Sequence, residues 1–283
     1  MNYLINIIPF LIIGVILYFS LKKEKKKHDE YFGKIVSNKN EKPKITKRQI
    51  NLENHIKFDN FLPNPKELQN LCISISALEA ILSQDWESRY YSYQKNWSDN
   101  EEICEMRNGS GDHILILFSS NGTVINGFAH ESEMNIKYTN QNKKTGNRNL
   151  IQGIWKGVVD DLPNVFNDFI FGEPVKSIGT TFCIWQTKMD NEWKTGKINY
   201  PNDEYKDGSK DLMELLDGNP YTYKKFAEEY YYEEELELKI KPIEKIYNGI
   251  IITKELVLDI NPEVNDFEQL KADLDEIGYK NKL

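Results

Sequence analysis

The sequence predicts an α+β protein with an N-terminal transmembrane helix, a tether, and a mixed body in which an antiparallel meander packs on helices. Three observations support this fold class. The chain begins with an uncharged apolar segment, continues with a basic stretch poor in apolar side chains, and then shows one clear helix signal followed by four short strand signals. Its 283 residues have room for one large or two small domains.

Residues 3–21 form the predicted anchor. They carry no charged side chain, and at about 1.5 Å per residue a helix of this length crosses a hydrocarbon core of about 30 Å. Lysines at 22, 23, 25, 26 and 27 follow the apolar run instead of preceding it, which favours an anchor over a cleaved signal peptide. By the positive-inside rule these lysines predict a single-pass protein of the bacterial inner membrane whose body faces the cytoplasm.

The predicted domain organisation has four parts. They are an anchor over residues 1–21, a basic tether over 22–60, a helix plus antiparallel sheet over 61–140, and an α+β continuation over 141–283 that forms one body with the preceding segment.

The charge of the chain is unevenly distributed. Residues 22–48 carry 11 of the 36 Lys and Arg and 4 of the 44 Asp and Glu, and residues 1–21 carry none, which leaves 25 basic and 40 acidic residues, a net charge of −15, for 49–283. An acidic body repels phosphate backbones, so the sequence predicts no nucleic-acid partner. The three cysteines, Cys72, Cys104 and Cys183, are too widely spaced for a metal pair or a disulfide framework, and we expect buried thiols and no cofactor.

The body opens with a helix. Asn64 is a typical cap, Pro65 suits the first helical position, and the apolar residues from Leu68 to Leu82 recur at steps of three and four. Four strands should follow, over Tyr90–Gln94, Glu102–Arg107, His113–Phe118 and Thr123–Phe128. The last two form a hairpin, because Asn121-Gly122 accepts the positive φ of a tight turn.

Further elements follow a polar surface loop predicted over residues 139–149. We expect helices over 151–159 and from 161–163 to 171–172, then a buried strand over 180–187 with an antiparallel return over 193–198. Short helices are predicted over 210–216, 221–231, 253–258 and 266–277.

Both histidines beyond residue 60 lie on the stretch 106–134, among several carboxylates. Histidine with carboxylate is the set that a zinc ion or a general acid–base pair requires, so Asp112, His113, His130 and Glu131 are candidate catalytic residues of a metal-dependent hydrolase. The alternative is a structural network in which His130 and Glu131 satisfy the backbone of a turn.

Arg107 precedes the glycine-rich turn 108–112. A guanidinium beside a nest of backbone amides is a candidate anion-binding site. The alternative is an ordinary salt bridge from Arg107 to Glu105 or Asp112.

Residues 203–214 approach the pattern of a calcium loop. Candidate metal ligands are Asp203, Asp207, Asp211 and Glu214, although Tyr205 stands where a third carboxylate belongs. A polar loop that caps the next helix is the alternative.

An acidic and aromatic run covers residues 228–235. Tyrosines offer apolar contact area and glutamates attract a basic protein, so Tyr230, Tyr231, Tyr232, Glu233 and Glu234 form a candidate partner surface. The alternative is a helix end with a solvated face.

The segments MRNGSGD, GFAHESEM, TTFCIWQT and LLDGNPYTYKKFAEEYY resemble those of an uncharacterised group of bacterial cytoplasmic proteins, some encoded near polymorphic-toxin loci, over roughly residues 65–278. The group has no assigned activity, so the resemblance implies no functional residue. Residues 161–169, DLPNVFNDF, are similar to a helix start of SUKH-type immunity proteins, which implies an α+β body that binds protein.

The sequence therefore predicts a membrane-anchored, cytoplasmic, non-enzymatic protein-interaction module, of immunity type in its narrower form, with the hydrolase on 106–134 as the alternative.

Overall fold

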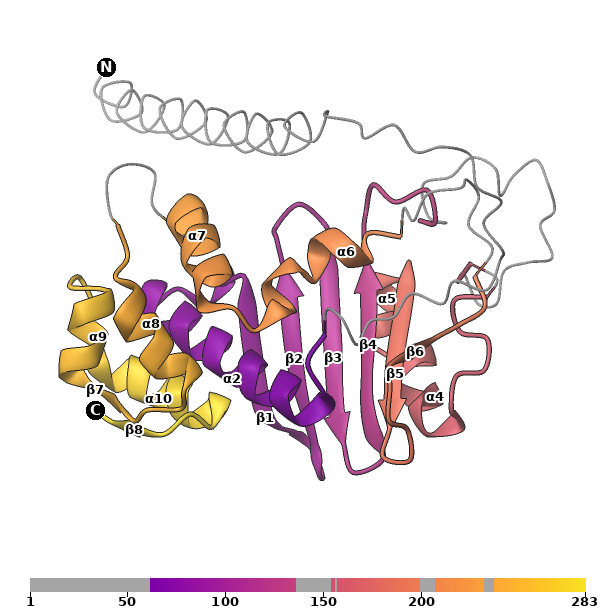
Figure 1. Cartoon of the computed structure of the whole chain (residues 1–283), viewed down its shortest axis with the longest axis horizontal. Helices are drawn as coiled ribbons and strands as arrows, with labels where there is room; N and C mark the ends of the chain where they lie inside the picture. The colour runs from indigo at the N-terminus through magenta and orange to yellow at the C-terminus, as the bar shows by residue number, and fades with distance from the viewer. Residues whose placement is uncertain (1–61, 136–153, 156, 199–206, 232–236) are drawn as a thin grey trace, which may run out of the picture. The chain divides into compact units, whose positions relative to one another are not determined.

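A six-stranded antiparallel sheet, in the strand order β1-β2-β3-β4-β5-β6, organises the fold (Figure 1). The computed structural model describes residues 62–135, 154–155, 157–198, 207–231 and 237–283, all within one compact unit spanning 56–283. The strands are β1 (Tyr91–Ser98), β2 (Glu101–Arg107), β3 (His113–Ser119), β4 (Gly122–Phe128), β5 (Phe182–Thr187) and β6 (Lys194–Thr195). The four strands predicted between residues 90 and 128 are confirmed, as is the hairpin.

The central strands bury side chains on both faces of the sheet. On β3, Ile114 and Ile116 belong to the larger core cluster, whereas Leu115 and Leu117 face two smaller clusters on the other side. Successive side chains of a strand point to opposite faces, so burial on both sides explains the unbroken apolar run from Ile114 to Phe118.

Helices cover the two faces unequally (Figure 1). The larger core contains α2 (Pro65–Leu82) and a C-terminal group made of α7 (Pro220–Tyr231), α8 (Ile240–Tyr247), α9 (Lys254–Ile260) and α10 (Phe267–Ile277). On the other side, α4 (Asn167–Phe171) and α5 (Val175–Ile178) pack against β3, β4 and β5. The remaining elements are η2 (Trp86–Ser88), η3 (Asn164–Phe166), α6 (Ser209–Leu212), η4 (Glu214–Asp217) and a parallel pair, β7 (Ile252–Thr253) and β8 (Asn281–Lys282).

The start of α2 is the predicted one. The side-chain oxygen of Asn64 accepts hydrogen bonds from the backbone N–H groups of Lys66 and Glu67, both at 3.1 Å, and Pro65 opens the helix. These bonds satisfy amides that no helical carbonyl can reach.

The predicted membrane span needs correction. In the described part of the chain, no helix combines the length and the apolar character needed to cross a bilayer. The body is α+β with an antiparallel sheet, but the structure provides no transmembrane helix for the predicted fold class. Residues 3–21, the tether and the loop 139–149 lie outside the described residues.

One local prediction is also wrong, and one helix was missed. Residues 157–160 form turns and Ile154 a single bridge, so the described part of 151–159 is not helical. The helix α8 was not predicted, because Pro242 and the lysines at 239, 241 and 245 obscure its short apolar face of Ile243 and Ile246.

The carboxyl group of Glu79 joins α2, β1 and α7. This side chain is fully buried. Oε2 accepts hydrogen bonds from the N–H groups of Tyr90 and Tyr91, at 2.6 and 3.2 Å, and from the hydroxyl of Tyr231. Oε1 accepts one from the hydroxyl of Tyr223 at 2.7 Å. Each of the three elements is therefore held to the others by one carboxyl group.

Burial dominates the titration of this carboxyl group. Removal from water raises the pKa of Glu79, and the hydrogen bonds from Tyr231, Tyr223, Tyr91 and Tyr90, which favour the carboxylate, offset part of the rise.

We expect Glu79→Ala to lower the free energy of unfolding by about 3 kcal/mol or more, because four buried donors lose their acceptor. Chemical denaturation measures this change. Glu67→Ala, at an exposed position of the same helix, is the control and should change stability much less. A loss below about 1 kcal/mol in Glu79→Ala would contradict the proposed role.

The raised pKa also predicts a pH dependence. A carboxyl group that holds its proton more tightly in the folded state stabilises the fold below its unfolded pKa, about 4.5, and this contribution is lost as the pH rises through the folded pKa. We therefore expect the unfolding free energy of the wild type, relative to Glu79→Gln, to fall as the pH is raised above 4.5. A constant difference between pH 4 and 8 would show that Glu79 does not titrate in this range.

Candidate functional site

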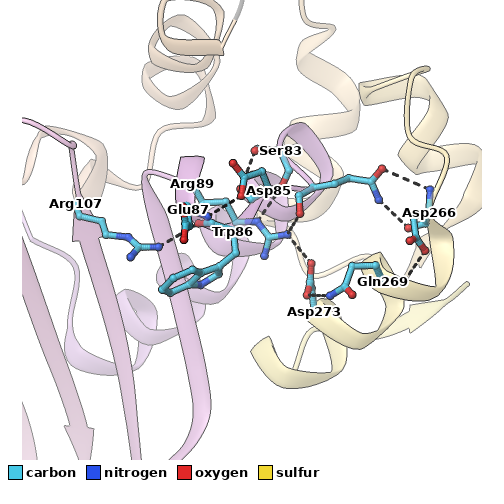
Figure 2. Close-up of polar contacts among 10 residues, drawn as sticks. Ser83, Asp85, Trp86, Glu87, Arg89, Arg107, Asp266, Gln269 and Asp273 are labelled. Atoms are coloured by element: carbon cyan, nitrogen blue, oxygen red, sulfur yellow. Dashed lines mark hydrogen bonds and ion pairs between the residues drawn. The ribbon is translucent and has the colours of Figure 1, made fainter. Parts of the chain in front are cut away.

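The turn between α2 and β1 presents Trp86 to solvent. Asp85 caps the turn: its carboxylate accepts a hydrogen bond from the N–H of Glu87 at 3.2 Å (Figure 2). It also accepts one from the hydroxyl of Ser88 at 2.7 Å. The Trp86 side chain remains 47% exposed. A large aromatic side chain is thus held on the surface by a short, capped turn.

Arg107, at the end of β2, stacks on this tryptophan. Its guanidinium carbon lies 3.8 Å from the centre of the Trp86 ring, and Nη2 donates a hydrogen bond to the Trp86 carbonyl at 3.1 Å (Figure 2). Among the described residues Nε of Arg107 has no hydrogen-bond partner, although it is buried. The stack orients both side chains and contributes about 0.5–1 kcal/mol at an exposed site.

The alternative predicted for Arg107 does not form. Glu105 binds His113 instead, with 2.5 Å between Oε1 and Nε2, and Asp112 binds His130. Burial acts to raise the pKa of Glu105, but the hydrogen bond and charge of His113, aided by the charge of Arg107, outweigh it and hold that pKa below the ordinary value.

The glycine-rich turn 108–112 is closed by its own side chains. Oδ1 of Asn108 accepts hydrogen bonds from the N–H groups of Ser110 and Asp112, at 2.9 and 3.1 Å. These two amides are therefore already paired within the turn, and the anion-binding site at Arg107 stays a prediction.

Hydrogen bonds to Asp112 hold the loop that follows β4. Oδ1 accepts hydrogen bonds from the backbone N–H and from Nδ1 of His130, both at 2.8 Å, while Oδ2 accepts one from Asn108 at 2.7 Å. Glu131 is 89% exposed and lies 3.7 Å from Nε2 of His130. Each histidine thus has its own carboxylate. The structural alternative named His130 and Glu131 as the side chains that satisfy the turn backbone, whereas here Asp112 and Asn108 accept hydrogen bonds from backbone N–H groups.

Within the described ranges, no three His, Cys, Asp or Glu side chains come together in a way that could hold a metal ion. In the predicted calcium loop, Asp203 lies outside those ranges. The Oδ1 atom of Asp207 accepts hydrogen bonds from the N–H and hydroxyl of Ser209, and Asp211 and Glu214 are exposed. The hydrolase and calcium-loop hypotheses therefore stay predictions.

The predicted partner surface is divided. Tyr231 lies against the core with its hydroxyl on Glu79, whereas Tyr230 is 37% exposed and stacks on Phe226. Burial raises the pKa of Tyr230, and the positive charge of nearby Arg107 offsets part of the rise. Tyr232, Glu233 and Glu234 lie outside the described residues. Of this run, Tyr230 joins the surface around Trp86.

A cavity of about 30 Å³ lies between α2, β1 and α10, with Trp86 among its lining residues. Arg89, another lining residue, binds Asp273 at 2.5 Å, and its Nε donates to the Ser83 carbonyl at 2.8 Å (Figure 2). Sequence reasoning missed Trp86, Arg89 and this cavity. The spacing of Asp85 and Ser88 is a capping signal that predicts the turn, but nothing local indicates that α10 lies beside it.

No protein-family model matches the chain, and neither a curated protein nor a solved structure matches it. The resemblances to the uncharacterised bacterial group and to SUKH-type immunity proteins therefore stay predictions.

We expect His113→Gln to raise the pKa of Glu105, because the carboxylate loses the charge of His113, which helps to lower that pKa. Because its folded pKa is lowered, Glu105 stabilises the fold at a pH above its unfolded pKa, and this contribution is lost as the pH falls through the folded pKa. In the variant the folded pKa is higher, so on acidification the loss should begin at a higher pH than in the wild type. Titration of the Glu105 carboxyl carbon by NMR measures the change. His130→Gln is the matched control, since His130 binds Asp112; an equal shift in both variants would contradict the pairing.

Proposed function

We propose that this protein is a non-enzymatic protein-interaction module that binds a basic protein through the surface around Trp86. This surface, called the Trp86 surface below, consists of Trp86, Glu87, Arg107 and Tyr230. The observation that carries the proposal is the exposed Trp86 ring, stacked by Arg107 and close to Tyr230.

The side chains of the Trp86 surface are the types that dominate protein interfaces. Trp, Tyr and Arg are enriched among residues whose truncation weakens binding most, because they bury a large area at a small loss of conformational freedom. The stack between Arg107 and Trp86 holds two of these side chains in place before binding, so they lose less conformational entropy when a partner binds.

The charge of the body indicates the kind of partner. Residues 49–283 carry a net charge of −15, and a basic protein approaches such a surface faster and in a preferred orientation. Inhibition of a basic toxin, the immunity role implied by the SUKH resemblance, would be one case of this function.

The test is retention of a basic protein from cell extract by the full-length protein, compared with Trp86→Ala. We expect Trp86→Ala to weaken binding by about 30-fold or more, the effect of losing a central interface aromatic. Raising the salt concentration should weaken wild-type binding, because the attraction is screened.

Trp97→Ala is the matched control. Trp97 is 42% exposed, similar to Trp86, but lies near the other end of β1. It should bind as the wild type does, and thermal melting should show that all three proteins are folded. Equal retention by Trp86→Ala and the wild type would reject the Trp86 surface as the binding surface.

A further inference from the structure

The turn between α8 and β7 holds two consecutive isoleucines on the surface. Ile250 is 50% exposed and Ile251 is 38% exposed. The N–H of Ile250 donates a hydrogen bond to the Lys245 carbonyl at 3.0 Å, and the hydroxyl of Tyr279 donates one to the Ile250 carbonyl at 3.1 Å. These bonds fix the backbone of the turn, so the two isoleucines form a lasting apolar patch instead of folding into the core.

Strand register places two lysines beside this patch. The parallel pair β7 and β8, which lies in the C-terminal helical group, aligns Ile252 with Asn281 (Figure 1). Ile252 is fully buried, and successive side chains of a strand point to opposite faces, so Ile251 lies on the outward face. Lys280 and Lys282 precede and follow Asn281 and therefore share that outward face.

The charge of this region is positive. Three exposed lysines form neither an ion pair nor a side-chain hydrogen bond with the described residues: Lys245, Lys280 and Lys282. An exposed carboxylate also reaches the strand pair, because Asp275 accepts a hydrogen bond from the Asn281 amide at 2.8 Å, but the lysines outnumber it. This surface, called the Ile250 face below, consists of Ile250, Ile251, Lys245, Lys280 and Lys282.

The side-chain types of the Ile250 face fit a lipid surface better than a protein. Protein interfaces are enriched in aromatic side chains and arginine and are depleted of lysine. Here the exposed side chains are isoleucines and lysines, and the adjacent ring of Tyr279 is buried. Apolar side chains beside lysines are typical of surfaces that lie in the headgroup region of a bilayer, where the apolar groups enter the interface and the ammonium groups meet lipid phosphates.

The charge of the whole body decides which surface an anionic bilayer attracts. Residues 49–283 carry a net charge of −15, so such a bilayer repels most of the body. A locally positive surface is attracted, over a range of about 10 Å at 0.1 M salt. This balance favours one orientation, with the Ile250 face toward the lipid.

We propose that the Ile250 face docks on the surface of an anionic bilayer. Ile250 and Ile251 enter the boundary between headgroups and acyl chains, and the three lysines bind lipid phosphates. The contact uses none of residues 3–21, and the Ile250 face shares no residue with the Trp86 surface. It is therefore a second binding surface, independent of the proposed function.

The test has to report on the Ile250 face itself, because the lysines between residues 22 and 27 also attract anionic lipid. Paramagnetic relaxation at single isoleucine methyl groups of the full-length protein does so. Nanodiscs of phosphatidylglycerol and phosphatidylcholine carry a gadolinium-chelating lipid, which speeds the relaxation of methyl groups near the bilayer. We expect this enhancement to be larger at Ile250 and Ile251 than at Ile178, which packs on the other side of the sheet. Discs of phosphatidylcholine alone should abolish the difference.

Two variants locate the contact. Lys280→Gln/Lys282→Gln removes two charges at exposed positions and should weaken docking by about tenfold or more, read as a loss of the enhancement at the Ile250 methyl. Ile251→Ser, read at the same methyl, should weaken it by about fivefold, because a side chain that enters the interface is lost. Thermal melting should show that both proteins are folded.

Lys210→Gln is the matched control. Lys210 is an exposed lysine on α6, away from β7 and β8 in sequence, and its loss should leave the enhancement at Ile250 unchanged. Equal enhancement at Ile250 and Ile178, or an unchanged enhancement in the Lys280 and Lys282 variant, would overturn the inference. Hexaglutamate that shifts the Ile250 and Ile251 methyl signals while anionic discs do not would also overturn it, in favour of an acidic protein.

The two proposals fail separately. Retention of a basic protein depends on Trp86, whereas lipid docking is read at Ile250. If Trp86→Ala abolishes protein retention and no methyl of the Ile250 face approaches the bilayer, the interaction module stands and the lipid surface fails. If the methyls approach the bilayer and no protein depends on Trp86, the lipid surface stands and the proposed function fails.

Discussion

The buried carboxyl group of Glu79 is the interaction on which the rest of the structure depends. It lies on α2 and collects two backbone N–H groups at the start of β1 and two phenol hydroxyls from α7. A buried carboxylate is strongly disfavoured unless it is hydrogen-bonded, so these four donors can occupy few arrangements. The position of β1, the edge strand of the sheet, is set relative to two helices by this requirement.

The Trp86 surface follows from that arrangement. The turn that carries Trp86 lies between Glu79 and the N–H groups that Glu79 binds at Tyr90 and Tyr91. Both ends of the turn are therefore fixed to the core within twelve residues. On the other side, Tyr231 is held by Glu79 and brings its neighbour Tyr230 toward Tyr90, with 5.3 Å between the ring centres of Tyr230 and Tyr90.

How far the sequence predicted this structure depends on whether the interactions are local. The start of α2 was predicted because its cap, Asn64, bonds to residues two and three positions away. The strands from β1 to β4 were predicted because alternation and turn residues are also local signals. The same holds for β5, whose apolar run is visible in the sequence.

The candidate site was much less predictable, because its contacts join distant parts of the chain. The composition of residues 228–235 predicted that Tyr231 is exposed. It instead bonds Glu79, which lies 152 residues away in the sequence. Arg89 binds Asp273 across 184 residues, and no periodicity indicates that α10 reaches the edge of β1. His130 and Arg107 were predicted as candidate site residues, but their partners were not. Those partners depend on the strand register, which places His113 opposite Arg107 on one side and opposite Phe128 on the other.

The unpaired groups near Trp86 stand out against this background of satisfied ones. Glu79 shows that the fold finds four donors for one buried carboxyl group, and Asp112 accepts hydrogen bonds from Asn108 in its own turn and from His130 beyond it. A buried polar atom left unpaired costs about 1–3 kcal/mol, a sizeable share of a typical net stability. Ser76 and Tyr91 adjoin one cavity next to the most exposed tryptophan of the described chain. Alanine and phenylalanine would fill these two positions without that cost, so neither hydroxyl stabilises the fold through a hydrogen bond with the described residues.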